Sequence, residues 1–307
     1  MALRKDIWRP FLVRMPMREL LRRGTLEGLR PHWLPNSGPF RFLADPFGFQ
    51  HGDELCVLVE AFDYRDRHGR IELLRFGPDL ALRERRTVLR EPWHLSYPLV
   101  VEEGGERFML PEAFRSGTLT LYRMEGAPDR WRPAARLTLD AVPIDATPVC
   151  HEGLWWLFYA PAGTRDDKVE RLHVAWAEHL AGPWHPHPGN PVRRDRGSSR
   201  PGGTALSTPD GVLLPTQDCT ATYGGAVRPL LVHTLTPDRF EAEAGPPVVA
   251  PAAYAPFTEG LHTMSALGDW TLLDAKRRAH PLPGLWIDAR RRLRRPPRAD
   301  AATPDRE

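Results

Sequence analysis

The sequence of 307 residues has only 3 cysteines, Cys56, Cys150 and Cys219. They are odd in number and far apart, and no CxxC spacing of a zinc or dithiol centre occurs. The chain also lacks a P-loop, a GxSxG elbow, an HExxH helix and a dinucleotide-binding glycine motif. We therefore expect free thiols in a reducing compartment and find no support for nucleotide-dependent, serine-hydrolase or zinc-protease chemistry.

Long hydrophobic runs are also missing. Arg4, Lys5 and Asp6 precede a short apolar stretch that more arginines follow, so we expect no signal peptide and no membrane span. A cytoplasmic location is the corresponding expectation. The net charge of +3 is small, and much of the excess lies in the first thirty residues and in 290–298. Because the folded region shows no basic and aromatic groove, we expect no nucleic-acid partner.

Aromatic and turn-forming residues are plentiful. The chain has 10 Trp, 12 Phe and 6 Tyr beside 33 Pro and 25 Gly, a composition typical of short strands and tight turns. A loose repeat of about fifty residues matches a four-stranded propeller blade. The units open with FRFLADPF, HLSYPLVV, PIDATPVC, SSRPGGTA and EGLHTMSA. We predict an all-β fold, a five-bladed β-propeller over residues 39–285.

The fifth repeat is short, with two clear strands before the sequence turns basic and rich in proline. Residues 1–38 are predicted to be a lead in which a strand near 7–13 completes the last blade and closes the ring. Within this lead, residues 17–29 form an amphipathic basic pattern that packs on the domain edge or lies on a membrane surface. Residues 286–307 are predicted to be a basic, Pro-rich disordered tail.

The innermost strands of a propeller ring a central channel, so polar residues repeated on them should converge at one mouth. Those positions hold Asp45, Tyr97, Asp145, Arg200 and His262.

Three carboxylates are the candidate catalytic residues. Asp45 ends an apolar strand before Pro46, and Asp145 occupies the corresponding place two blades on; each could instead cap a turn. Two carboxylates that face one cavity can take different pKa values and act as base and acid. Glu112, on the second strand of blade two, is either a third site carboxylate or an exposed glutamate.

Further polar and aromatic residues suit the recognition of a sugar, which needs hydrogen bonds and a stacking face. An arginine fork can clamp a carboxylate, phosphate or hydroxyl, and a histidine can orient substrate, although an ion pair or a structural hydrogen bond would explain either. No cofactor or metal is expected. With Tyr97, the candidate substrate-binding residues are Arg200, Gln217, Asp218, Tyr223, Glu259 and His262.

The ordered motifs FLADPF, HLSYPLV with MLPEA, IDATPV, PWHPHPGNPV, SRPGG, QDC with YGG, and GLHT span residues 40–275. This set resembles the N-terminal propeller domain of plant glucosamine inositolphosphorylceramide transferases and related bacterial proteins. More distantly it is similar to the five-bladed propellers of glycoside hydrolase families 43 and 32.

The resemblance implies that Asp45 is the catalytic base or nucleophile. Family-43 enzymes also use an Asp that tunes pKa and a Glu that donates the proton, but Ser96 and Tyr97 stand where the blade-two acid is expected. Asp145 falls at the blade-three position of the acid and could replace it, with Glu112 as the remaining carboxylate. The plant proteins carry a separate glycosyltransferase domain, so their transferase activity is not carried over.

We therefore expect a glycoside hydrolase-like enzyme that cleaves or transfers a glycosidic bond. The alternative is a non-catalytic glycan-binding or scaffold module that works with a glycosyltransferase partner in polysaccharide or glycolipid biosynthesis.

Overall fold

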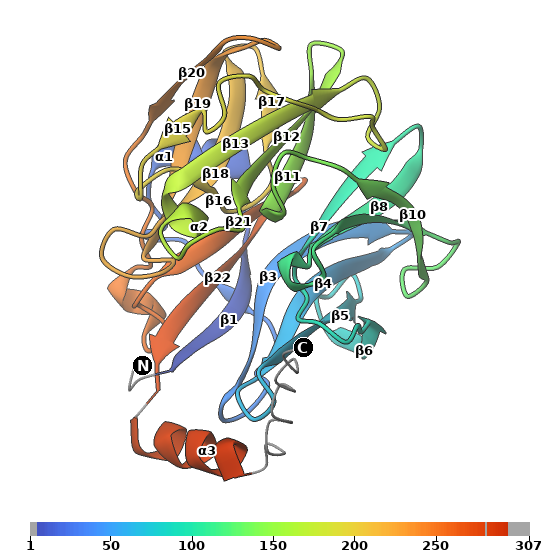
Figure 1. Ribbon diagram of the computed structural model, residues 1–307. Coiled ribbons are helices and arrows are strands. Elements are labelled where there is room, and N and C mark those ends of the chain that lie inside the picture. Colours follow the sequence, from blue (N-terminus) through green and yellow to red (C-terminus); the bar gives the residue numbers. More distant parts are fainter. Residues whose placement is uncertain (1–4, 280, 294–307) are drawn as a thin grey trace, which may run out of the picture.

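The computed structural model describes residues 5–279 and 281–293, which form five antiparallel sheets around a common centre (Figure 1). The strand that opens each sequence repeat lies at the inner edge of its sheet, and the sheets follow the chain, apart from two N-terminal strands that join the last one. The all-β, five-bladed propeller predicted from the fifty-residue repeat is thus confirmed. Among the described residues, no helix is long and apolar enough to cross a bilayer.

Blades 1 and 2 have the strand order of a meander, and in blade 3 a short fifth strand pairs with the third. Blade 1 contains β3 (Arg41–His51), β4 (Glu54–Asp63), β5 (His68–Phe76) and β6 (Leu82–Leu89). Blade 2 contains β7 (Ser96–Glu103), β8 (Glu106–Glu112), β9 (Leu119–Met124) and β10 (Trp131–Leu137), with the short helix η1 (Phe114–Ser116) before β9. Blade 3 contains β11 (Pro143–His151), β12 (Leu154–Pro161), β13 (Arg171–Ala177), β14 (His185–Pro186) and β15 (Arg193–Arg194), with α2 (Asp167–Glu170) before β13.

The last two blades depart from this pattern. Blade 4 contains β16 (Arg200–Pro201), β17 (Leu206–Thr208), β18 (Gly211–Asp218), β19 (Ala226–Leu235) and β20 (Phe240–Ala244), followed by η2 (Ala252–Tyr254). Blade 5 joins the two ends of the chain, with β21 (Leu261–Leu267), β22 (Trp270–Arg278), β1 (Asp6–Val13) and β2 (His32–Trp33).

The ring closes through β1, which pairs along its whole length with β22, from Asp6 opposite Arg278 to Val13 opposite Thr271. This is the closure predicted for residues 7–13. The sequence missed β2, which is only two residues long and pairs outside β1. The helix α1 (Met17–Arg23) packs on the edge of the domain through buried Met17, Leu20 and Leu21. This is the first of the two alternatives given for residues 17–29.

The apolar core lies in layers between neighbouring blades. β4 of blade 1 and β8 of blade 2 share one cluster, and β12 of blade 3 and β18 of blade 4 share another. Another cluster joins blade 5 to blade 1 through Leu12, Leu43 and Leu272. Burial on both faces explains the nearly continuous apolar runs of the second strands. The axis is thus left for polar side chains.

A bulge recurs on the inner strands and directs side chains to that axis. The register shifts between Ala44 and Phe47, and equivalent shifts interrupt β7, β11 and β21. In the first three bulges Asp45, Tyr97 and Asp145 take the left-handed conformation, with φ of 50°, 45° and 51°. A bulge leaves its extra residue out of the ladder, so these side chains turn away from the sheet.

The C-terminal end corrects one prediction. Residues 286–307 were expected to be a disordered tail, but α3 extends over Pro281–Leu293, below the propeller in Figure 1. Asp288 binds Lys5 Nζ at 2.6 Å, and Ile287 is buried. These contacts hold the helix against the N-terminal strand. Residues 294–307 of the predicted tail lie outside the described residues.

Candidate functional site

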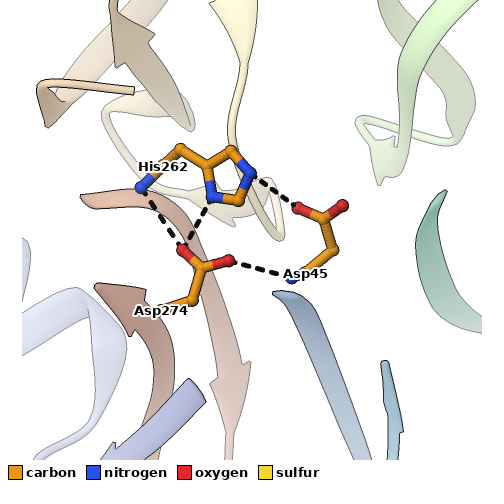
Figure 2. A group of neighbouring side chains, drawn as sticks. All are labelled: Asp45, His262 and Asp274. Carbon is orange, nitrogen blue, oxygen red and sulfur yellow. Dashed lines mark hydrogen bonds and ion pairs between the residues drawn. The ribbon is translucent and has the colours of Figure 1, made fainter. Parts of the chain in front are cut away.

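The centre of the site is an imidazole that lies between two carboxylates (Figure 2). His262 Nδ1 is 2.8 Å from Asp274 Oδ1, and His262 Nε2 is 3.4 Å from Asp45 Oδ1. Asp274, on β22, also accepts the backbone N–H groups of Asp45, His262 and Thr263, at 2.9, 3.3 and 3.0 Å. One buried carboxylate therefore fixes the bulges of blades 1 and 5 together.

Burial and neighbouring charges shift the pKa values of this centre. Burial raises the pKa of Asp45 to about 6, although the charge of His262 and the Thr263 hydroxyl act to lower it. Burial would lower the pKa of His262, but the charges of Asp274 and Asp45 outweigh it and raise that pKa above its usual value. The protonated imidazole is thus the form that the two carboxylates favour.

Asp45, His262 and Asp274 could also hold a metal ion. Each offers one ligand atom, and these three atoms lie within 4.8 Å of one another. A metal would need a lone pair on a His262 nitrogen. Both nitrogens face carboxylate oxygens, so a protonated His262 can balance these negative charges where no metal ion is bound.

Asp145 lies in a second polar cluster at the bulge of blade 3. Its Oδ2 accepts a hydrogen bond from Arg200 Nε at 2.7 Å and one from Gln217 Nε2 at 2.8 Å. Both donors come from blade 4, and all three predicted residues therefore meet. The ion pair with a guanidinium engages the ionised carboxylate, which suits a charged acceptor better than a proton donor.

Glu112 is buried, so the alternative of an exposed glutamate is excluded. Its carboxylate accepts the Ser96 hydroxyl at 2.7 Å and the backbone N–H of Phe114 at 2.6 Å. Burial raises its pKa to about 7, and the charge of Asp145 acts in the same direction. A carboxyl group half protonated near neutral pH is suited to general acid or base work.

Tyr97 is engaged within the fold rather than directed at a ligand. Its hydroxyl lies 2.8 Å from Thr147 Oγ1, 3.0 Å from the Gly203 carbonyl and 2.6 Å from the Gly203 N–H. Its own backbone N–H donates to Asp45 Oδ2 at 3.1 Å. The side chain is only 1% exposed, so it joins blades 2, 3 and 4 across the centre.

The other predicted residues separate into two groups. Tyr223, which is 40% exposed, lies with its ring centroid 5.5 Å from that of His262, at the edge of the centre. Asp218 pairs with Arg228 at 2.9 Å and Glu259 with Arg278 at 3.3 Å. Neither acid has a polar contact with the central carboxylates, so their positions are those of ordinary ion pairs.

Sequence reasoning missed two carboxylates, Asp274 and Glu60. Glu60 on β4 is buried, and burial and the charge of Asp45 raise its pKa well above the usual value. His94 Nε2 lies 3.4 Å from it, while His94 Nδ1 accepts the N–H of Gly69 at 2.9 Å. The only signal was a lone acid in the apolar run CVLVEAF.

Lys276 and Trp8 were also missed. Lys276 is fully buried; it lies 3.3 Å from Asp6 Oδ2, contacts the Tyr223 carbonyl and stands 5.2 Å from the centre of the Trp8 ring. The closing strand β1 therefore contributes directly to the wall beside His262.

Taken together, the ring of blades, the recurring bulges and the buried carboxylates that they position define a five-bladed β-propeller with a polar centre. Solved structures with this fold include a putative glycoside hydrolase from Bacteroides ovatus (TM-score 0.56, 14% identity, 78% of this chain and 92% of that one). The β-1,2-mannobiose phosphorylase of Listeria innocua is also similar (TM-score 0.55, 11% identity, 83% and 94%). At these identities the likeness concerns the fold alone.

The particular family follows from the sequence. Residues 34–250 match the family described as glucosamine inositolphosphorylceramide transferase 1, N-terminal, and the chain belongs to it. The glucosamine inositolphosphorylceramide transferase 1 of Oryza sativa subsp. indica is 34% identical to this chain over 208 residues, which are 66% of this chain. That of Arabidopsis thaliana is 32% identical over 210 residues, 67% of this chain. The chain spans 28% and 27% of the length of these two relatives.

Proposed function

We propose that this propeller is a carbohydrate-active domain in which Asp45 and Glu112 act as a base or nucleophile and an acid at a glycosidic bond. The observation that supports it best is the convergence of buried carboxylates from separate blades: Asp45, Glu112 and Asp145 come from β3, β8 and β11, and the charge of Asp145 acts to raise the pKa of each of the other two. Burying several carboxyl groups around one axis costs stability, and folds keep such arrangements where charge is used.

The environments divide the roles among the three acids. Asp145 is held by Arg200 and Gln217 and serves as a fixed negative charge. Glu112, whose pKa is raised to about 7, can carry a proton at neutral pH, and Asp45, at about 6, is largely ionised there. Sequence reasoning left Asp145 and Glu112 as alternatives for the acid, and the ion pair of Asp145 with Arg200 favours Glu112.

A second function is supported by the way Asp45 is bound. Thr263 Oγ1 donates to its Oδ1 at 2.6 Å and the Tyr97 N–H to its Oδ2 at 3.1 Å, while His262 lies beside Oδ1. A carboxylate so engaged and only 5% exposed suits a structural role. The domain would then bind a glycan without cleaving it, beside a separate glycosyltransferase. The name of the curated relatives, a glucosamine inositolphosphorylceramide transferase, supports a carbohydrate ligand under either function.

The deciding experiment is a screen of the wild type against glycans and aryl glycosides that records binding and turnover. Asp45→Asn and Glu112→Gln keep size and hydrogen bonding but remove charge. Asp79→Asn, on an exposed loop of blade 1, is the matched control. Turnover that is lost in both site variants and kept in the control supports the enzyme.

Binding without turnover in the wild type supports the recognition module. If the wild type neither binds nor turns over any compound of the panel, both functions are contradicted.

A further inference from the structure

A cationic pocket lies beside the central carboxylates. Its volume is about 380 Å³. Its wall is formed by Arg165 and residues of α2, by Arg196 and Arg200, and by residues 219–223, which follow β18. None of the lining side chains is acidic. Four are cationic: Arg165, Lys168, Arg196 and Arg200.

Two of these cations have no carboxylate partner. Arg196 lies 2.6 Å from Asp166 and 3.2 Å from Glu170, and Arg200 pairs with Asp145. Among the described residues, Arg165 and Lys168 form no ion pair, and Lys168 instead stands 4.1 Å from the centre of the Phe114 ring. Unpaired cations in a concave site give a positive local potential.

Arg200 connects the pocket to the carboxylates. Its Nε donates to Asp145, its Nη1 to the Lys168 carbonyl at 3.2 Å, and its Nη2 lies 3.4 Å from the Tyr223 hydroxyl. A guanidinium has five N–H groups, so two remain for an anion. Tyr223, whose ring also faces His262, forms the shared border.

We propose that this pocket binds the anionic group, a phosphate or a carboxylate, of a ligand whose sugar lies at the central carboxylates. The inference rests on the proposed function and adds the substrate class: an anionic carbohydrate. Arg165 and Lys168 supply the net charge, and Arg200 supplies the forked hydrogen bonds that planar or tetrahedral oxyanions accept.

The first test uses inorganic phosphate, which needs no sugar site. Titration calorimetry at low ionic strength compares the wild type with the double variant Arg165→Gln/Lys168→Gln. Arg136→Gln, an exposed arginine on β10, is the matched control. Because the double variant removes both unpaired cations, it should bind phosphate at least about tenfold more weakly. Equal affinity in both proteins, or no saturable binding to the wild type, would overturn the proposal.

The second test separates this proposal from the proposed function. Glucose 6-phosphate, glucuronate and glucose are compared as ligands of the wild type and the double variant. A gain of at least about tenfold over glucose that the double variant loses supports the pocket, and the better of the two anions identifies the group. Equal binding of all three sugars contradicts it.

Phosphate binding that depends on Arg165 and Lys168, without any glycan binding or turnover, would uphold the pocket and refute the carbohydrate function. Glycan turnover that depends on Asp45 but is unchanged in the double variant would uphold the carbohydrate function and refute the anion pocket.

Discussion

Trp8 stacks on His262 with ring centroids 3.8 Å apart and planes 14° from parallel. One ring belongs to the strand that begins the fold and the other to the inner strand of the last blade, so closure of the propeller and construction of the site depend on the same contact. The Trp8 side chain is 5% exposed and His262 3%.

Trp8→Ala should therefore loosen closure and site together. Removing a buried tryptophan costs about 3–5 kcal/mol, and the ring of His262 loses its support. Urea unfolding measures the change. Trp286→Ala, which removes a ring that is 58% exposed on α3, is the control and should cost much less. Equal losses in the two variants would show that Trp8 has no special part in closure.

Stability should depend on pH through Glu112. The folded protein keeps this proton up to about pH 7, while an unfolded glutamate releases it near its usual pKa of 4.5. Between these values the folded state binds more protons, so stability falls as pH rises, by up to about 3 kcal/mol for this group. Denaturant unfolding from pH 4 to 8 should show that Glu112→Gln removes this part of the slope.

Glu102→Gln, at an exposed position on blade 2, is the matched control and should keep the wild-type slope. A slope in Glu112→Gln equal to that of the wild type would mean that Glu112 ionises freely in the folded protein.

Asp274→Asn should lower the pKa of His262. The asparagine keeps the shape but removes the negative charge that raises this pKa against the effect of burial. The amide also places N–H donors among backbone N–H groups, which should destabilise the fold by about 3–5 kcal/mol. NMR titration of the imidazole measures the pKa, and Asp269→Asn in the exposed turn of the same hairpin is the control. An unchanged His262 titration would contradict the assigned ion pair.

Tyr97→Phe should destabilise the centre without creating a cavity. The Gly203 N–H loses its acceptor at 2.6 Å, and a buried N–H without a partner costs about 1–3 kcal/mol. Hydrogen exchange at Gly203 should speed up more than elsewhere in blade 4. Tyr122→Phe, whose hydroxyl has only a long contact of 3.4 Å with Glu91, should change little. Similar exchange in the two variants would rule out this bond as a link between blades.

The sequence predicted the ring and the inner positions because both follow from repetition. Asp45, Tyr97 and Asp145 stand at the same place in successive blades, and the bulge there has the same handedness in all three. Asp274, which fixes Asp45 and His262, could not be predicted in the same way. Asp274 lies in LLDAKRR, where alternation with Lys276 resembles a solvent-facing edge, yet both side chains are fully buried.

Blade 5 combines β1 and β2 with β21 and β22, and this determines when its strands can pair during synthesis. The ribosome releases β1 before blades 1 to 4 and β22 after them, so β1 must wait, unpaired on the side where β22 will bind, while these blades emerge. His262, Asp274 and Trp8 come together only when that wait ends. The nascent protein therefore acquires its complete carboxylate centre last, after most of its interblade packing can already form.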